Sequence, residues 1–143
     1  GEEFTFIYPD GIKGYVDELS DMRGFTETHS FSGEGKGRDK EDRDEYKVRA
    51  EVAFCFNNEV NALEYFHNSS FLEHGGAPEK ATRSAFVSQI DAYLKQNGKY
   101  LKTDSKISFQ DVEDCLALVI SSFSISSSYM INSSFINLLI NLI

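Results

Sequence analysis

Three histidines and two cysteines are the residues of this chain whose types suit acid–base, nucleophilic or metal chemistry. His29, His67 and His74 show no metal-ligand spacing to one another, and the chain contains no H-E-x-x-H, C-x-x-C or G-x-S-x-G motif. Cys55 and Cys115 are too few and too far apart for a disulfide framework or a zinc site, so we expect two buried thiols. The residue pattern therefore predicts no catalytic residue and no metal site.

A pair of glycines suits a different chemistry, the binding of phosphate by backbone N–H groups at the start of a helix. Gly75 and Gly76 stand in the stretch HGGAPEKA, residues 74–81, just before a predicted helix. No Walker lysine accompanies them, and Pro78 has no N–H to donate. We therefore interpret the pair as a tight turn that directs the chain into the helix, and the sequence predicts no cofactor-binding residue.

Length and charge limit the classes of protein to which the chain can belong. Its 143 residues suit one domain with a single core, and a hydrophobic content of 41% argues against disorder. The net charge of −9 excludes a general nucleic-acid surface, so any contact with DNA must be local, transient or made by another segment. The opening GEEFTFIYPD has neither a basic start nor an apolar stretch, so we expect a cytoplasmic protein with no membrane segment.

The first half of the chain reads as a strand, a helix, a second strand and a charged loop. Residues 4–8, FTFIY, alternate as a strand that PDG then ends. Residues 10–21 should form an amphipathic helix, because its apolar side chains recur at three- and four-residue steps at Ile12, Tyr15, Val16 and Leu19. A strand is predicted at 28–32. Residues 33–45 should be a solvated loop, because ten of the thirteen are charged, with both signs.

The second half of the chain predicts a hairpin, a long helix, a helical turn and a last strand. Residues 46–56 alternate between apolar and charged side chains, and ALEYFHNSSF reads as their antiparallel partner, so residues 46–70 should form a hairpin. A helix over 78–98 would end at Gly98. Its buried stripe would be Ala85, Phe86, Ile90, Tyr93 and Leu94. A capping box at 108–111 precedes the strand LALVISSF, and this order predicts an α+β fold with helices on one face of a mainly antiparallel sheet.

Five segments of the chain form one recognisable pattern: FTFIYPDGIKGYVDEL, HSFSGEG, YKVRAEVAF, EHGG before a helix, and SFQDVEDCLALVIS. Together they resemble the transducer domain of DNA gyrase B and of its topoisomerase IV counterpart, in the type II DNA topoisomerase family. The resemblance covers residues 4–124, and it implies a transducer domain over 1–124 with an uncharged tail over 125–143. It also implies a fold like domain 2 of ribosomal protein S5. The mismatch-repair ATPase MutL shares that fold but fits DGIKGYVDEL less well.

The resemblance implies a mechanical function. In this family the domain couples ATP binding in a neighbouring N-terminal ATPase domain to DNA strand passage, together with a DNA-cleavage domain, a gyrase A-like subunit and DNA. ATP and magnesium would then belong to the parent enzyme, and this segment alone should be inactive. The hairpin and long helix would move as a rigid body, with Gly75-Gly76 as a hinge. The rival interpretation is a free-standing α+β protein-interaction domain whose acidic surface meets a basic partner.

The sequence departs from the family pattern in two places. Ala77 and Pro78 stand where the family usually has Thr-His. The family also carries a Gln-Thr-Lys loop whose lysine reaches the γ-phosphate of ATP, and this loop should fall near 130–136. The sequence there is MINSSFI, so the lysine is absent near Asn132–Phe135, and no lysine follows Lys106. Coupling to ATP should therefore be lost, because no uncharged side chain replaces that fixed positive charge.

The tail belongs to a longer stretch, residues 115–143, that contains no Lys, Arg, Asp, Glu or His. A membrane span is disfavoured because Ser and Asn interrupt every apolar run. A divergent terminus that packs on the core and a slip of the reading frame near Ser124 both remain open. We favour the frame slip, because the resemblance stops where the composition changes.

Overall fold

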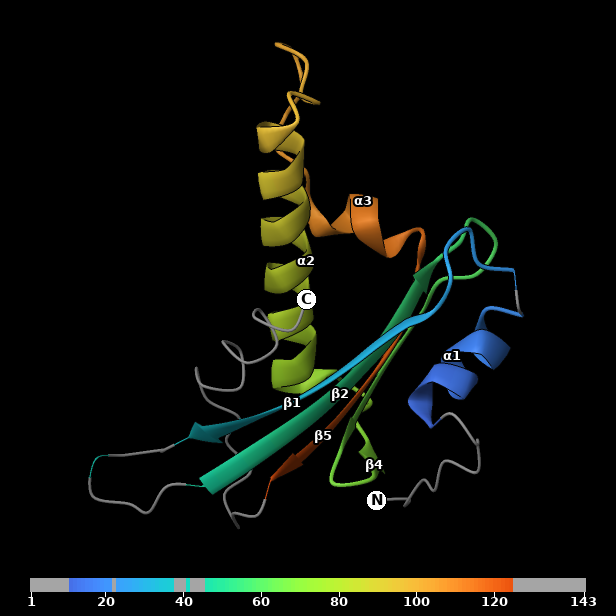
Figure 1. Ribbon diagram of the computed structural model, residues 1–143, viewed down its shortest axis with the longest axis vertical. Helices are drawn as coiled ribbons and strands as arrows, with labels where there is room; N and C mark the ends of the chain where they lie inside the picture. The colour runs from blue at the N-terminus through green and yellow to red at the C-terminus, as the bar shows by residue number, and fades with distance from the viewer. Residues whose placement is uncertain (1–10, 22, 38–40, 42–45, 125–143) are drawn as a thin grey trace.

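The computed structural model describes residues 11–21, 23–37, 41 and 46–124, so the expected strand at 4–8 and the tail at 125–143 lie outside the described residues. Eight elements follow one another along the chain (Figure 1). In order they are α1 (Ile12–Leu19), β1 (His29–Gly37), β2 (Tyr46–Phe56), β3 (Ala62–His67), β4 (Ser70–Phe71), α2 (Gly76–Gln96), α3 (Phe109–Glu113) and β5 (Leu116–Ser124). The strands form one five-stranded sheet in the order β1-β2-β5-β3-β4.

The sheet is mainly antiparallel, and its central strand is β5. β5 runs antiparallel to β2, with Val52 opposite Ile120, and parallel to β3, with Tyr65 opposite the same Ile120. The predicted hairpin over 46–70 is therefore wrong, because β5 lies between its two expected arms. Every residue from Leu116 to Ser122 is buried, and a strand that is apolar on both faces reaches full burial only in the middle of a sheet.

Helices cover both faces of the sheet. Leu118 and Ile120 of β5 share a hydrophobic cluster with Phe86 of α2, whereas Ala117 and Val119 pack in a second cluster with α1. Figure 1 shows α1 on the opposite side of the sheet from α2 and α3. The expectation that the helices lie on one face is therefore wrong for α1. The physical reason is that β5 has apolar side chains on both of its faces, and each face must be covered.

The first edge strand is longer than the sequence indicates. β1 continues through Gly37, and residues 33–37 pair with residues 46–50 of β2, so the predicted solvated loop is wrong for 33–37. Glu34 and Lys36 are exposed, and charged side chains are common on the outer strand of a sheet. Because charged residues alternate with glycine over 33–37, the sequence indicated a loop where the structure has an edge strand.

The helix boundaries follow the local signals of the sequence. Gly98, with φ +59°, follows the last turn of α2, where the Lys99 N–H donates to Leu94 O at 2.8 Å and the Gly98 N–H donates to Lys95 O at 3.2 Å. Ser108 starts α3 and donates its backbone N–H to the Asp111 carboxylate at 2.8 Å, as the capping box predicts. These bonds hold the pKa of Asp111 below its usual value.

The buried stripe predicted for α2 is only partly correct. Ala85 and Phe86 are buried, but Tyr93 is 59% exposed, because the last turns of α2 extend past the sheet (Figure 1). Two side chains bind Asp91 in these turns. Tyr100, on the segment that follows the helix, donates its hydroxyl to the Asp91 carboxylate at 2.8 Å, and Lys95 of α2 itself donates to the same carboxylate at 2.7 Å. None of the helices in the described part of the chain is long and apolar enough to span a membrane.

Candidate functional site

The glycine pair forms a sharp turn at the start of α2. The Gly76 N–H donates to His74 O at 2.6 Å across Gly75, and the Gly75 N–H donates to Leu72 O at 3.1 Å. Gly75 has φ +67° and ψ −43°, a strained region that side-chain-bearing residues rarely adopt, and Gly76 has φ +62°. A Cβ on Gly75 would also lie 2.6 Å from the Glu79 Cβ, so position 75 requires glycine for space as well as for conformation.

This turn does not form a phosphate cradle. Both glycine N–H groups already donate to carbonyl oxygens of the preceding loop. The Glu79 carboxylate faces the same backbone, because a Cβ on Gly75 would clash with its Oε2. The carboxylate thus occupies the space in which an anion would have to approach Gly75. The geometry therefore suits a change of chain direction rather than the binding of a phosphate group.

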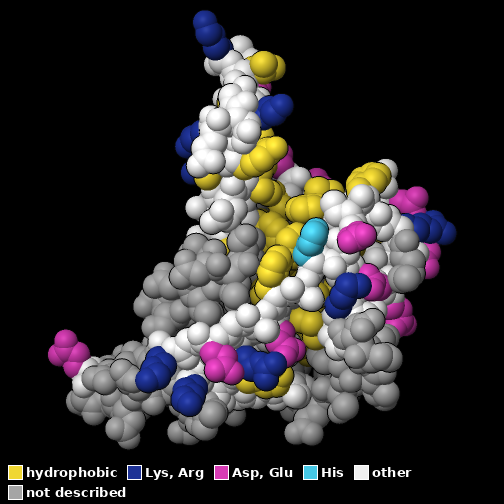
Figure 2. All heavy atoms as spheres, in the orientation of Figure 1, with side chains coloured by type: hydrophobic (Ala, Val, Ile, Leu, Met, Phe, Trp, Pro, Cys, Tyr) yellow, Lys and Arg dark blue, Asp and Glu magenta, His cyan; other side chains and the backbone are white. Residues whose placement is uncertain are grey.

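An aromatic cluster fixes α2 to the sheet beyond this turn. The Phe86 ring of α2 meets the Phe54 ring of β2 edge-on at 5.2 Å between centroids, and it meets Phe56 at 6.4 Å. Phe54 and Phe56 also contact each other edge-on at 5.8 Å. Figure 2 shows apolar side chains gathered in the angle between α2 and the sheet. Edge-to-face rings stabilise a packed core beyond the area that they bury, so α2 and β2 should move together.

The three histidines lie in separate surroundings. His29 begins β1 and lies against Phe54, and His74 is exposed in the glycine turn. His67 is half-buried at the end of β3, where its Nδ1 lies 2.8 Å from the Ser122 hydroxyl and its Nε2 lies 3.2 Å from the Ser124 hydroxyl. Sequence reasoning missed this network, because nothing in the sequence indicates that β3 and β5 are neighbours.

Ser122 sets the direction of the hydrogen bonds around His67. Its hydroxyl donates to Phe66 O at 3.1 Å, so it can accept a bond from the Nδ1–H of His67. Nε2 can then accept a bond from the Ser124 hydroxyl. The neutral imidazole thus joins two strands by side-chain hydrogen bonds, which is a structural role.

The burial of His67 predicts that stability falls in acid. Desolvation lowers the pKa of His67 below its ordinary value of 6.5, so the unfolded chain binds this proton more readily than the folded chain. The contribution of neutral His67 should be complete above pH 6.5 and should be lost as the pH falls toward the folded-state pKa. Urea unfolding at about pH 7.5 and about pH 5.5 measures this loss. His67→Gln should lose less stability than the parent over this interval, and an equal loss in both proteins would contradict the assignment.

The cysteines and acidic residues form no metal site. Cys55 is buried beneath α1, whereas Cys115 is only partly buried, and desolvation raises the pKa of its thiol. Two buried thiols were expected, so that expectation is correct for Cys55 alone. Among the described residues, no group of three or more His, Cys, Asp or Glu side chains could hold a metal ion.

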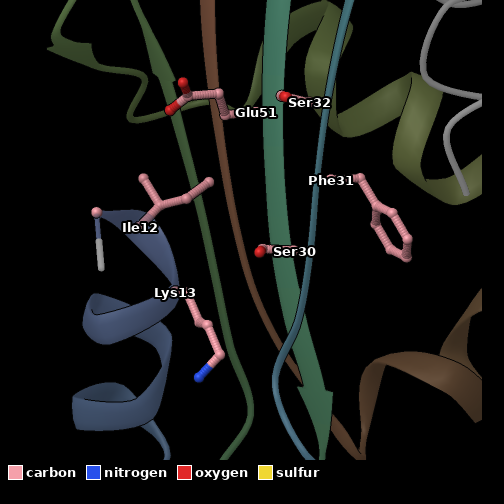
Figure 3. Close-up of a pocket in the computed structure, with 7 residues that line it drawn as sticks. Ile12, Lys13, Ser30, Phe31, Ser32 and Glu51 are labelled. Atoms are coloured by element: carbon pink, nitrogen blue, oxygen red, sulfur yellow. The ribbon is translucent and has the colours of Figure 1, made fainter.

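A hollow of about 270 Å³ lies between α1 and the strands β1 and β2 (Figure 3). Ser30 and Ser32 of β1 border it, together with Lys13 of α1 and Glu51 of β2. Lys13 pairs with Asp17 at 3.2 Å, and Glu51 pairs with Arg49 at 2.7 Å. Because both charged groups already have partners, the hollow offers no converging charges that would bind a ligand.

Comparisons with known proteins connect this geometry to one family. A family model described as DNA gyrase B matches residues 11–130. The DNA gyrase B protein of Mycoplasma pneumoniae is 31% identical over 124 residues, which cover 84% of this chain and 19% of that protein. The DNA gyrase B protein of Campylobacter jejuni is 27% identical over 122 residues, which cover 85% of this chain and 15% of that protein. The chain thus spans less than a fifth of the length of these relatives.

A solved structure extends the comparison to the fold. The 43K ATPase domain of Thermus thermophilus gyrase B, in complex with an aminocoumarin, superposes with a TM-score of 0.71 and 18% identity. The match covers 99% of this chain and 38% of that chain, and at this identity it shows a shared mixed α+β fold. The resemblance found in the sequence is confirmed at the level of the family. The chain belongs to the DNA gyrase B family of type II DNA topoisomerases.

Proposed function

We propose that this segment is the transducer of a gyrase B-type DNA topoisomerase, which couples ATP binding in a neighbouring ATPase domain to DNA strand passage. The observation that carries the proposal is the contrast between a firmly packed α2 and the glycine turn from which it starts. Phe54, Phe56 and Phe86 hold the helix against the sheet. Gly75 and Gly76 provide backbone freedom at a single point, as a hinge between rigid bodies requires.

The fold of ribosomal protein S5 domain 2 is part of this proposal. β3 and β5 are parallel neighbours, and α2 and α3 lie between them in the chain. Such connections are right-handed in most proteins, whereas the transducer family uses a left-handed one. A parallel pair joined through helices is compatible with that connection, and it supports the proposal together with the family match over residues 11–130.

A transducer should perform no chemistry of its own. The hydroxyls of Ser122 and Ser124 meet His67 in bonds that join β3 to β5, and among the described residues no group of three or more His, Cys, Asp or Glu side chains could hold a metal ion. ATP and magnesium would be bound by the ATPase domain of the parent enzyme, and a gyrase A-like subunit and the DNA-cleavage domain would be the other partners. We expect the purified chain to release no phosphate from ATP above the buffer background and to give no heat of ATP binding in calorimetry. A rate that rises with protein concentration would contradict the transducer assignment.

The far end of α2 is where a local contact with DNA should occur. Lysines gather there in a chain that is acidic as a whole: residues 95–106 contain Lys95, Lys99, Lys102 and Lys106, against Asp104. All four lysines are exposed, and Figure 2 shows basic side chains projecting from this end of the helix. Lysines at an exposed tip can replace the counterions of DNA phosphates without any base contact.

Neutralising this tip should weaken binding to duplex DNA without regard to its sequence. In Lys99→Gln/Lys102→Gln, the plot of log affinity against log salt concentration should become shallower by about 2, because two phosphate contacts are lost. Fluorescence anisotropy with a labelled duplex at low salt measures this slope. Lys47→Gln, an exposed lysine on β2, is the matched control and should leave the slope unchanged. Equal slopes in the double variant and the parent would place the DNA contact elsewhere.

A further inference from the structure

Glu79 and Arg83 form an ion pair on the first two turns of α2. Arg83 donates from Nε and Nη2 to Oε1 of Glu79, at 3.0 Å and 2.8 Å. The two residues are four positions apart, so the pair lies along one face of the helix. A pair of this kind on an exposed helix contributes little by itself, and the contacts at its two ends decide whether it has a further role.

One end of the ion pair reaches α3. The Arg83 guanidinium carbon lies 4.8 Å from the centroid of the Phe109 ring, in the position of a cation–π contact. Phe109 is the first residue of α3 and is 7% exposed, and the capping box of Ser108 and Asp111 fixes the start of this helix. α3 leads directly into β5, the central strand. Arg83 therefore connects α2 to the middle of the sheet through a ring that has little freedom to move.

The other end of the ion pair touches the glycine turn. The space in front of Gly75 is filled by Glu79, whose Oε2 would clash with a Cβ of residue 75 and whose own Cβ lies 2.6 Å from that point. A change in the backbone angles of Gly75 would therefore push on the Glu79 side chain. Because the Glu79 carboxylate accepts hydrogen bonds from Arg83, this displacement would move the Arg83 guanidinium away from the Phe109 ring.

We propose that Glu79, Arg83 and Phe109 form a latch that ties the glycine turn to α3. A change in the backbone of the turn would weaken the contact of Arg83 with Phe109, and loss of that contact would loosen the turn. The latch rests on the proposed function only for its consequence in the whole enzyme, where it would resist rotation of α2 about Gly75-Gly76. Arg83 is then a positioning residue of the turn. Lysine cannot replace it fully, because a lysine ammonium lacks the planar fork that bonds Glu79 while lying over a ring.

Hydrogen exchange on the whole chain tests the latch without any enzyme assay. In Arg83→Met, amides of 79–86 and of 109–114 should both exchange on the order of five-fold faster, from the combined loss of the ion pair and the ring contact. Phe109→Leu keeps an apolar side chain in α3 and removes the ring. Phe109→Leu should also accelerate amide exchange in residues 79–86, because coupling between two sites is reciprocal. Amides of β5 should keep the parent rate in both variants, which excludes general unfolding.

A matched control and a double variant complete the experiment. Arg49→Met removes the exposed ion pair with Glu51 on β2 and should change neither α2 nor α3. Arg83→Met/Phe109→Leu should accelerate exchange by less than the product of the two single effects, because the same contact is lost only once. The latch would be overturned if Arg83→Met accelerated amide exchange only in residues 79–86. It would also be overturned if the effect in the double variant equalled the product of the two single effects.

The exchange result and the proposed function can fail separately. If the exchange coupling is present but Gly76→Ala leaves supercoiling per ATP unchanged in an active gyrase that carries this segment, the latch stands and the transducer role fails. If exchange shows no coupling while supercoiling per ATP still depends on the glycine turn, the transducer role stands and the latch fails.

Discussion

Replacing Gly75 with alanine should lower the free energy of unfolding by about 2–4 kcal/mol, a large part of the stability of a domain of this size. Two costs combine. The backbone at φ +67° and ψ −43° is strained for any residue with a Cβ, and this strain costs about 1–3 kcal/mol. The new methyl group would also lie 2.6 Å from the Glu79 Cβ, an atom whose position the helix backbone fixes. Urea unfolding at neutral pH measures the difference.

Gly76→Ala is the matched control for this experiment. Its backbone angle is also positive, at φ +62°, but the nearest atom to its added Cβ is the Pro78 Cδ at 3.9 Å. Only the conformational cost applies, about 1–2 kcal/mol. Equal effects of the two substitutions would show that contact with Glu79 does not restrict the turn, and both the steric argument and the latch would lose their basis.

Leu118→Ala should be nearly as damaging, with an expected loss of about 2–5 kcal/mol in the free energy of unfolding. Leu118 is fully buried in the central strand, among the side chains that α2 and α3 cover. Shortening its isobutyl side chain to a methyl group would leave a cavity that neighbours cannot fill, because β2 and β3 hold β5 on both sides. Leu101→Ala, the same change at a side chain that is 70% exposed, should stay within about 0.5 kcal/mol of the parent.

The result for Leu118→Ala also tests the strand order of the sheet. If Leu118→Ala cost no more than Leu101→Ala, β5 would not be the buried central strand. The two-sided arrangement of α1 against α2 and α3 would then need revision. A loss in the expected range would support the strand order β1-β2-β5-β3-β4.

Features encoded within a few residues could be predicted from the sequence. The stripe of Ile12 and Val16 indicated α1, the Ser108 capping box indicated the start of α3, and Gly98 indicated the end of α2. Each depends on contacts within one or two turns, which residue type and spacing determine. The glycine turn before α2 was placed correctly in the chain for the same reason, although its role as a hinge remains a prediction.

Features that depend on distant partners could not be predicted in this way. The placement of β5 between β2 and β3 depends on the packing of the whole sheet, so adjacent strands were mistaken for a hairpin. The bonds of His67 to Ser122 and Ser124 follow from that same placement. The contact of Arg83 with Phe109 also joins segments that are far apart in the chain. The γ-phosphate lysine, absent near Asn132–Phe135, concerns residues outside the described part of the chain.

Transmission of motion through the glycine turn can be tested in a chimeric gyrase. Residues 11–124 would replace the matching segment of Mycoplasma pneumoniae gyrase B, which keeps its own sequence before and after the segment. ATP hydrolysis and DNA supercoiling would be measured together with gyrase A. Gly76→Ala is the informative variant, because it restricts the backbone angles of the turn and avoids the clash with Glu79 that a Cβ at position 75 would cause. Leu101→Ala is its control.

Gly76→Ala should leave the rate of ATP hydrolysis close to that of the unsubstituted chimera. Supercoiling per ATP hydrolysed should fall on the order of tenfold, because closure of the ATPase domain would no longer move α2. Unchanged supercoiling per ATP in Gly76→Ala, with a chimera that is otherwise active, would contradict the claim that this segment couples ATP to DNA passage.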